Sequence, residues 1–459
     1  MNNVADTLST QVPHIVRGNL VTGGGQDYGR FATPPLDVDQ LRWLRSTAPP
    51  AANVPVDEII DILVTLGDWL RRDPDGIVDQ ALQASFATNP LEKGVLERSF
   101  NTLGDYFDRQ GIEFQINQEL GGKDVLDGWR QVVTPDGRKA GIRAFPSRML
   151  HVIAGNAPGV SAMTVVRGAI TKSLNLIKLP SNDLYTATAL LRGLSKVAPG
   201  HPVSQSFSAA YWRGGDTAVE AKLFQPLFFD KIVAWGGETT IRSAKNYIGP
   251  GLELVSFDPK TSISFVGREV HSDNETRQRA ADAAARDVTV MDQQACVSSR
   301  FQFVEGSIED VDAYCEAMLP RLGVERPFSS ICGSPLSGTI REEIEVLRDL
   351  EPEFKVFGEL DGTGVIIRSD EPVDFHPDGR VVNVVRVDDL NHAISRANFA
   401  TQTVGIFPDS RRQELRDALA ARGVQRVTAL GSAGLVYPGL PHDGFYPLQR
   451  FVRWVNDED

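Results

Sequence analysis

The chain has little cysteine, no long apolar run and no positive excess of charge. Only three cysteines, Cys296, Cys315 and Cys332, occur in 459 residues, an odd and sparse set that excludes a disulfide scaffold and favours a reducing compartment. No stretch approaches the roughly 18 apolar residues of a membrane span, and the N-terminal sequence has no signal-peptide pattern. We therefore expect a cytoplasmic chain without a membrane span.

Several functional signatures are also missing. The 47 basic and 60 acidic residues give a net charge of -13, which argues against nucleic acid as a partner. The motifs G-x-x-x-x-G-K-[ST], G-x-G-x-x-G, H-E-x-x-H and G-x-S-x-G and a paired C-x-x-C are absent, so metal hydrolysis and serine-esterase chemistry lose most of their support. The seven histidines have no metal-ligand spacing, and we expect no metal site.

What is present is a repeated alternation of strands and helices. Apolar segments such as MLHVIAG, LNLIKLP and FDKIVAWGG alternate with helical ones such as PGVSAMTVVRGAITKS, and a second series runs from TSISFVG to RVTAL. This alternation is typical of an α/β fold with parallel sheets covered on both faces. Ligands are then expected beyond the carboxyl ends of the strands.

The pattern divides the chain into four segments. We expect an irregular N-terminal arm over 1–55, a nucleotide-binding domain over 56–260, an α/β catalytic domain over 261–430 and a tail over 431–459 that packs back on the body. Within the second segment, 126–145 reads as a hairpin around a PDG turn. Its exposed edge predicts an oligomer contact.

Three polar residues stand where chemistry is expected. Cys296 lies in DQQACVSSRFQFVEG, in a polar loop before a strand, whereas Cys315 in DAYCEAMLP and Cys332 in SSICGSP fit buried spectators. Asn156 in HVIAGNAPG follows one strand, and Lys178 in LIKLPSND ends the next. Singly, these residues are also compatible with a packed thiol, a turn asparagine and a surface lysine.

Their order along the chain resembles the aldehyde dehydrogenase superfamily. An asparagine after one strand, a lysine after the next, the glycine pair in WGGET and then a cysteine loop follow its pattern. QQACVSS and the tail PHDGFYPLQRFVRWV look like the LuxC-type (long-chain fatty) acyl-CoA reductases, over nearly the whole chain from about residue 56. The resemblance implies a Rossmann-type cofactor domain, a catalytic domain and an oligomerisation hairpin.

The same resemblance assigns roles to these residues. Cys296 corresponds to the nucleophile, and Asn156 with the backbone amide of Cys296 corresponds to the oxyanion hole. Lys178 matches the lysine that binds the adenosine ribose, and Gly236 and Gly237 match the segment that approaches the pyrophosphate.

The resemblance also bears on the choice of cofactor. Ser181 stands where relatives that prefer NAD commonly have a glutamate. A small neutral side chain leaves room for a 2′-phosphate, so NADPH is favoured over NADH, with Lys178 helping to neutralise the phosphate.

Two departures from the superfamily affect the expected chemistry. Hydrolytic members carry E-L-G-G-K, whereas this chain has LELVSFDPKTS, so either Glu253 is the water-activating base or Ser256 stands in its place. The segment that holds the nicotinamide ribose reads VDFHPDG, with Val373 in place of the carboxylate and Asp374 beside it.

These departures favour reduction of an acyl-CoA to the aldehyde through an acyl-cysteine intermediate, which needs no activated water. Two alternatives stay open: an NAD(P)-dependent aldehyde dehydrogenase that uses Glu253 as its base, and an acyltransferase or acyl carrier that uses Cys296 alone. The resemblance further implies acyl-CoA or an acylated carrier as substrate, an acyl-protein synthetase as partner and a homo-oligomer, either a dimer or a tetramer.

Overall fold

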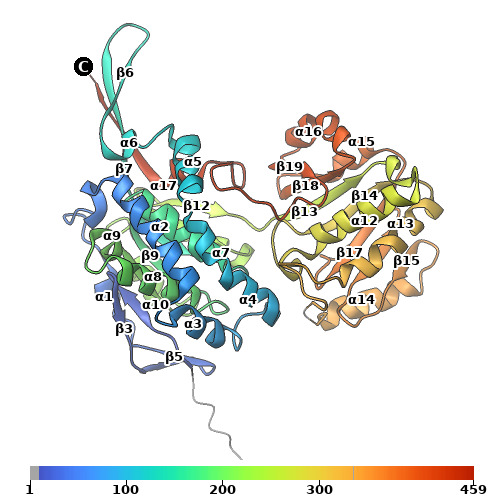
Figure 1. Ribbon diagram of the computed structural model, residues 1–459, viewed down its shortest axis with the longest axis horizontal. Helices are drawn as coiled ribbons and strands as arrows, with labels where there is room; N and C mark the ends of the chain where they lie inside the picture. Colours follow the sequence, from blue (N-terminus) through green and yellow to red (C-terminus); the bar gives the residue numbers. More distant parts are fainter. Residues whose placement is uncertain (1–9, 334, 459) are drawn as a thin grey trace, which may run out of the picture. The chain divides into compact units, whose positions relative to one another are not determined.

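The computed structural model describes residues 10–333 and 335–458, which form two compact units (Figure 1). The first unit contains the described residues up to Asn89, then Ser99–Asp258 and those from Tyr437 onward. The second unit contains Pro90–Arg98 and Pro259–Val436. Each unit is described by itself below.

A seven-stranded sheet organises the first unit. In spatial order its strands are β12 (Glu253–Phe257), β11 (Lys231–Trp235), β8 (Arg148–Val152), β9 (Leu174–Lys178), β10 (Phe207–Ala210), β2 (His14–Val16) and β3 (Asn19–Val21). The strands from β12 to β10 are parallel, whereas β2 and β3 are antiparallel additions at one edge. The predicted arm is therefore not wholly irregular, because its residues 14–21 extend this sheet. Strands of three residues are too short to leave a readable alternation.

Helices cover this sheet because their apolar residues recur at helical spacing. The main ones are α2 (Val56–Arg72), α7 (Gly159–Ile170), α8 (Thr186–Val197), α10 (Thr217–Leu223) and α11 (Glu238–Lys245). In α2, Ile59, Ile60 and Leu63 are fully buried, and burial of such a side chain contributes about 1.5–3 kcal/mol. The helix ends at Asp73, which adopts a left-handed φ of 40°.

A separate three-stranded sheet contains the predicted hairpin. Its strands are β6 (Arg130–Val133), β7 (Lys139–Pro146) and β20 (Val452–Glu458), all antiparallel. The tail strand β20 pairs with β7 over seven residues, from Val452 opposite Pro146 to Glu458 opposite Ala140. One edge of the hairpin is thus covered by the tail.

The second unit has its own seven-stranded sheet. In spatial order its strands are β15 (Phe354–Phe357), β16 (Val365–Ser369), β17 (Val381–Val387), β14 (Ser299–Glu305), β13 (Thr261–Val266), β18 (Thr401–Phe407) and β19 (Arg426–Ala429). All pairs except β15 with β16 are parallel. The covering helices include α12 (Asn274–Thr289), α13 (Ile308–Leu322), α14 (Gly338–Arg348) and α16 (Arg412–Ala421).

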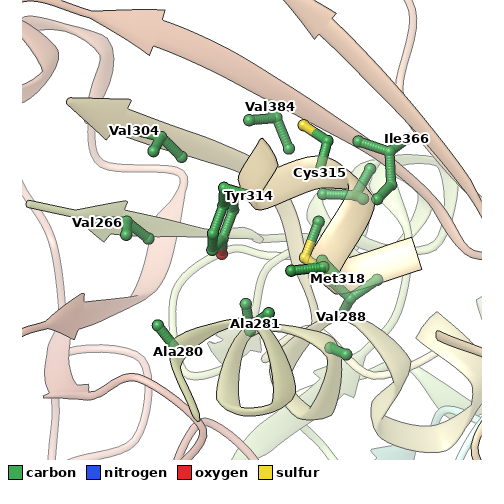
Figure 2. Close-up of a cluster of buried hydrophobic side chains, with 14 of the residues drawn as sticks. Val266, Ala280, Ala281, Val288, Val304, Tyr314, Cys315, Met318, Ile366 and Val384 are labelled. Atoms are coloured by element: carbon green, nitrogen blue, oxygen red, sulfur yellow. The ribbon is translucent and has the colours of Figure 1, made fainter. Parts of the chain in front are cut away.

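Helices α12 and α13 form the core of this unit with the sheet. Figure 2 shows Tyr314, Cys315 and Met318 of α13 in one cluster with Ala280 and Ala281 of α12. All five side chains are fully buried. The alanines let α12 approach its neighbours closely, since a small side chain leaves room for dense packing.

Candidate active site

The carboxyl edge of the first sheet brings together three of the predicted positions. Because β8, β9 and β11 are parallel neighbours, the segments that follow them meet at one edge. Lys178 ends β9 opposite Val152 of β8, and Gly236 follows β11 directly. Asn156 lies half-buried in the loop between β8 and α7. The residues predicted from separate motifs therefore share one end of one sheet.

Lys178 presents a nearly buried ammonium group at this edge. It is 9% exposed, and its Nζ lies 5.5 Å from the ring centroid of Trp212 and 5.9 Å from that of Tyr211. Burial lowers the pKa of Lys178 to about 8, and the carboxylate of Glu220 opposes this decrease. Among residues 10–333 and 335–458, Nζ donates no hydrogen bond to the protein, so its donors are available for ligand oxygens.

The sequence motifs did not indicate the environment of this lysine. Tyr211 and Trp212 follow β10, and the exposed Arg213 comes next. Burial raises the pKa of Tyr211, while the guanidinium groups of Arg213 and Arg30 oppose the increase. The aromatic pair at the end of β10 was the available signal, and a strand end with two adjacent aromatic rings often packs against a cation.

The loop after β9 packs against the loop after β8. A Cβ at Gly155 would stand 2.1 Å from Oδ1 of Asn182, so only glycine fits there. Ser181 is exposed, whereas Asp183 is fully buried and accepts a hydrogen bond of 2.5 Å from Thr186 Oγ1. Burial raises the pKa of Asp183 to about 6. Ser181, three residues after Lys178 in the chain, keeps an exposed side chain.

The glycine pair gives this edge a permissive backbone. Gly236 has a φ of 156°, and a Cβ added to it would lie 3.1 Å from Thr240 Cβ. Gly237 is the N-cap of α11, and nothing lies within 4 Å of the position its Cβ would take. Backbone amides at a helix N-terminus favour an anionic group, so the pair fits the predicted pyrophosphate segment.

Glu253 is not at this edge. It opens β12 opposite Lys231, the first residue of β11, at the amino end of the strands. Its carboxylate accepts hydrogen bonds from Lys231 Nζ at 2.7 Å and from Arg450 Nε at 2.9 Å. Burial would raise the pKa of Glu253, but these two cations outweigh it and the pKa is lowered. The residue near the carboxyl end of β12 is Ser256.

The tail contributes a histidine beside the ends of β11 and β12. Trp235 and Phe257 end these strands, and their rings stack with centroids 3.6 Å apart. The ring of His442 stands edge-on to both, at 5.1 and 5.2 Å. Asp443 follows with a left-handed φ of 49°, and its Oδ1 lies 4.0 Å from His442 Nε2. In the sequence, the tail PHDGFYPLQRFVRWV was only part of the resemblance to a family, and it did not predict where His442 lies.

Cys296 lies in the second unit, exposed in the loop that ends at β14, between the buried residues Gln293 and Val297. The chain reaches it through Met291, Asp292 and Gln293, which have left-handed φ values of 51°, 51° and 68°. Such a conformation costs a non-glycine residue about 1–2 kcal/mol. Ser262 Oγ of β13 donates a hydrogen bond of 2.7 Å to the carbonyl oxygen of Cys296. The thiol is therefore presented by a strained turn.

The other two thiols differ from each other. Cys315 is fully buried in the cluster of Figure 2, and burial raises its pKa. Cys332 is exposed, so the prediction that it is a buried spectator is wrong. The residues around Cys332 form a loop and not a strand, and loop residues are more often exposed to solvent than strand residues.

The structure accounts for the valine in VDFHPDG, the segment predicted to correspond to the nicotinamide-ribose site. Val373 is 8% exposed and packs in an apolar cluster, and its backbone N–H donates to Asn383 Oδ1 at 2.9 Å. Asp374, the next residue, is exposed.

No group of His, Cys, Asp or Glu in the described ranges could hold a metal ion. Over those same residues, every helix is too short or too polar to cross a bilayer.

Comparisons with known proteins show what this chain is similar to. The family model described as acyl-CoA reductase (LuxC) matches residues 51–454. A long-chain acyl-protein thioester reductase of Photorhabdus laumondii subsp. laumondii is 30% identical over 352 residues, which cover 76% of this chain and 70% of that protein.

Two solved structures show the same fold. Aldehyde dehydrogenase 21 from Physcomitrella patens, in complex with succinate, gives a TM-score of 0.74 at 14% identity and covers 98% of both chains. An NADP-dependent glyceraldehyde-3-phosphate dehydrogenase from Bacillus halodurans C-125, complexed with NADP, gives 0.68 at 16% identity and covers 98% of this chain and 99% of that one. The predicted α/β, aldehyde dehydrogenase-like fold is confirmed.

Proposed function

Because the chain belongs to the acyl-CoA reductase (LuxC) family, we propose that it reduces a fatty acyl thioester to the aldehyde. NADPH is the hydride donor and Cys296 carries the acyl group. The observation that carries this proposal is the exposed Cys296 thiol on a strained turn. A nucleophile must be accessible and held in one orientation, and the exposed thiol and the constrained backbone before it support this proposal.

The first half of the reaction is thioester exchange. The Cys296 thiolate attacks the acyl carbonyl, a new carbon–sulfur bond forms, and the bond to the sulfur of coenzyme A breaks. Coenzyme A leaves as a thiolate and takes a proton from solvent. The backbone amide of Cys296 and the side chain of Asn156 are proposed to stabilise the negative charge on the carbonyl oxygen, an effect of about 3–4 kcal/mol per donor in other enzymes.

The second half releases the aldehyde. When bound, NADPH supplies the hydride that reduces the acyl carbonyl on Cys296. The resulting thiohemiacetal anion then collapses to aldehyde and returns the Cys296 thiolate. In this scheme water must not hydrolyse the acyl-enzyme. The carboxylate of Glu253 is paired with Lys231 and Arg450, which supports the proposal that it does not activate a water molecule.

The residues at the carboxyl edge of the first sheet fit a nicotinamide dinucleotide. Lys178 has available donors, and Gly236 and Gly237 leave the backbone open for the pyrophosphate. Ser181 is exposed and neutral, which favours NADPH over NADH because no carboxylate repels a 2′-phosphate. Arg213 follows β10, the strand beside β9, and its positive charge also favours NADPH because it can pair with the 2′-phosphate.

Two further proposals concern partners. The related reductase from Photorhabdus is named for an acyl-protein thioester, so either acyl-CoA or an acyl-protein is the donor for this chain. We also propose a homo-oligomer that uses the sheet of β6, β7 and β20, where Val133 is 71% exposed and Trp454 is 41% exposed. Sedimentation of the purified chain measures the oligomeric state.

The decisive experiment follows the acyl group. The purified protein is incubated with tetradecanoyl-CoA and examined by intact mass, and NADPH is then added and aldehyde measured. We expect a covalent adduct that Cys296→Ala abolishes and that Cys332→Ala, which removes the other exposed thiol, retains. An adduct that forms but gives no aldehyde with NADPH would instead favour the acyltransferase alternative.

A further inference from the structure

The turn before Cys296 is held by a buried ion pair. Oδ1 of Asp292 lies 2.5 Å from Nη2 of Arg380, and the two side chains are 1% and 0% exposed. Ser330 donates to the same Oδ1 from both its backbone N–H and its Oγ, each at 2.9 Å. The carboxylate therefore has three donors around it, which satisfies a charge that is otherwise unfavourable in a protein interior.

Arg380 connects this carboxylate to two other segments of the second unit. Its Nη1 donates to the carbonyl oxygens of Leu322 at 3.1 Å and Ile331 at 2.7 Å. Its Nη2 also donates to the carbonyl oxygen of Ser330 at 2.5 Å. The guanidinium group thus joins the end of α13 and the loop around Ser330 to the turn, and its position is set by fixed backbone atoms.

Gln293 forms a second connection from the same turn. Its Oε1 accepts from the backbone N–H of Arg380 at 2.7 Å, and its Nε2 donates to the carbonyl oxygen of Val381 at 2.8 Å. Nη2 of Arg300 donates to the carbonyl oxygen of Gln293 at 2.7 Å. Strained backbone persists only where surrounding contacts determine it, and here these contacts come from residues 380–381 and from β14.

The stability of the fold alone does not explain why the Asp292–Arg380 ion pair is buried. A buried ion pair is often no more stabilising than apolar residues of similar volume, although loss of one partner is strongly destabilising. Asp292 of this pair lies four residues before Cys296, whose side chain is exposed. A rigid support under an exposed nucleophile keeps the sulfur and its backbone amide in the geometry that carbonyl attack requires.

We propose that Asp292 and Arg380 are positioning residues that orient Cys296 for acyl transfer. The proposal rests on the proposed function, since it assumes that Cys296 takes the acyl group. It assigns the effect to orientation of the sulfur and not to its exposure. A small alkylating reagent can reach an exposed thiol from many directions, whereas a thioester carbonyl needs one direction and a nearby amide donor.

The test compares two reactions of the same thiol in Asp292→Asn. The rate of acylation by tetradecanoyl-CoA is followed by intact mass, and the rate of alkylation by iodoacetamide is measured alongside. We expect acylation to slow by about tenfold or more while alkylation stays within about twofold of the wild type. Asp292→Glu, which retains the charge, should recover part of the acylation rate.

Asp312→Asn is the matched control. Asp312 also pairs with a buried arginine of the second unit, with Oδ1 3.0 Å from Nε of Arg368, but it lies on α13 beside β16 and not in the turn. The Asp312→Asn variant should have a lower melting temperature, but its acylation rate should not fall relative to its alkylation rate. Ser330→Ala provides a second variant that removes one donor to Asp292 and creates no unpaired charge, in case Asp292→Asn does not fold.

The outcomes separate the two proposals. Equal acylation rates in wild type, Asp292→Asn and Ser330→Ala would overturn the positioning role alone, as would a loss of acylation that Asp312→Asn shares. If the wild-type protein forms no adduct while iodoacetamide labels Cys296, the proposed function fails and the positioning role fails with it.

Discussion

The carboxyl edge of the first sheet and the Cys296 turn of the second unit reach special backbone geometry in opposite ways. At the edge, the unusual positions are glycines: Gly155 in a close approach and Gly236 with a φ of 156°. In the turn, Met291, Asp292 and Gln293 are left-handed without being glycine. A binding edge needs a backbone that ligands can approach, whereas a nucleophile needs one held firmly, and firmness here comes from contacts with Arg380.

Within the first unit, whose sheet edge bends at glycines, the largest expected vulnerability is a charge introduced into the sheet. His151 of β8 is fully buried, its Nε2 lies 3.0 Å from Asn175 Oδ1, and burial lowers its pKa to about 4. The folded pKa is below the unfolded value near 6.5, so the unfolded chain binds the proton first and stability falls as pH decreases from about 6.5 to 4. The expected loss is roughly 2 kcal/mol between about pH 7 and pH 5.

His151→Gln should reduce that loss, as measured by the melting temperature of the first unit across the same pH range. His392→Gln, at an exposed position, should leave the acid-side loss unchanged. An identical pH dependence in wild type and His151→Gln would show that this histidine is not the group whose protonation destabilises the sheet.

The next largest effect concerns the ammonium group at the edge. Lys178→Ala should weaken NADPH binding by about 10–100-fold, because a charge-assisted hydrogen bond contributes about 1.5–3 kcal/mol. Acylation of Cys296 in the absence of NADPH should be unaffected. Fluorescence titration measures the affinity, and Ser181→Ala is the control that removes no charge from the same loop; equal losses in both variants would argue against a specific role for the ammonium.

Replacement of Gly236 or Gly237 by alanine tests how much the backbone geometry of this edge depends on glycine. Gly236→Ala should lower stability by about 1–2 kcal/mol, because its φ of 156° is unfavourable for alanine. Gly237→Ala has open space around its Cβ position and should keep its melting temperature while still weakening NADPH binding through a clash with the pyrophosphate. If Gly237→Ala binds NADPH with wild-type affinity, the pyrophosphate does not approach this segment.

The smallest effect is expected at Glu253. Its side chain is 41% exposed, so Glu253→Gln should change stability by less than about 1 kcal/mol. NADPH oxidation that depends on acyl-CoA should stay within about twofold of the wild type, because the carboxylate is not expected to act on the acyl-enzyme. Formation of carboxylic acid from aldehyde by the wild type, lost in this variant, would instead support the oxidative alternative.

Much of this molecule was readable before the structure. The alternation of apolar and helical segments predicted both parallel sheets. Asn156, Lys178 and Cys296 were singled out by their places at strand ends together with an order that resembles the aldehyde dehydrogenase superfamily, and their roles stay predictions. In α2, leucines and isoleucines recur at helical spacing and form its buried face.

The residues that hold the turn before Cys296 could not be predicted from the sequence, because they lie far from it along the chain. Ser330 and Arg380 lie 38 and 88 positions from Asp292, and no local pattern links residues so far apart. Glu253 shows a second limit: the sequence allowed two alignments, and only the strand register shows that Glu253 lies at the amino end of β12 and Ser256 near its carboxyl end. Cys332 shows a third, since apolar neighbours in a loop do not ensure burial.

The tail strand has a consequence for how the chain is made. Residues 259–436 of the second unit are consecutive, whereas the first unit is finished only by the segment from Tyr437 onward. Phe451 packs on the main sheet beside Met149 and Val233, and β20 covers β7. During synthesis on the ribosome, the second unit therefore has all of its chain while the first unit still waits for its edge strand β20.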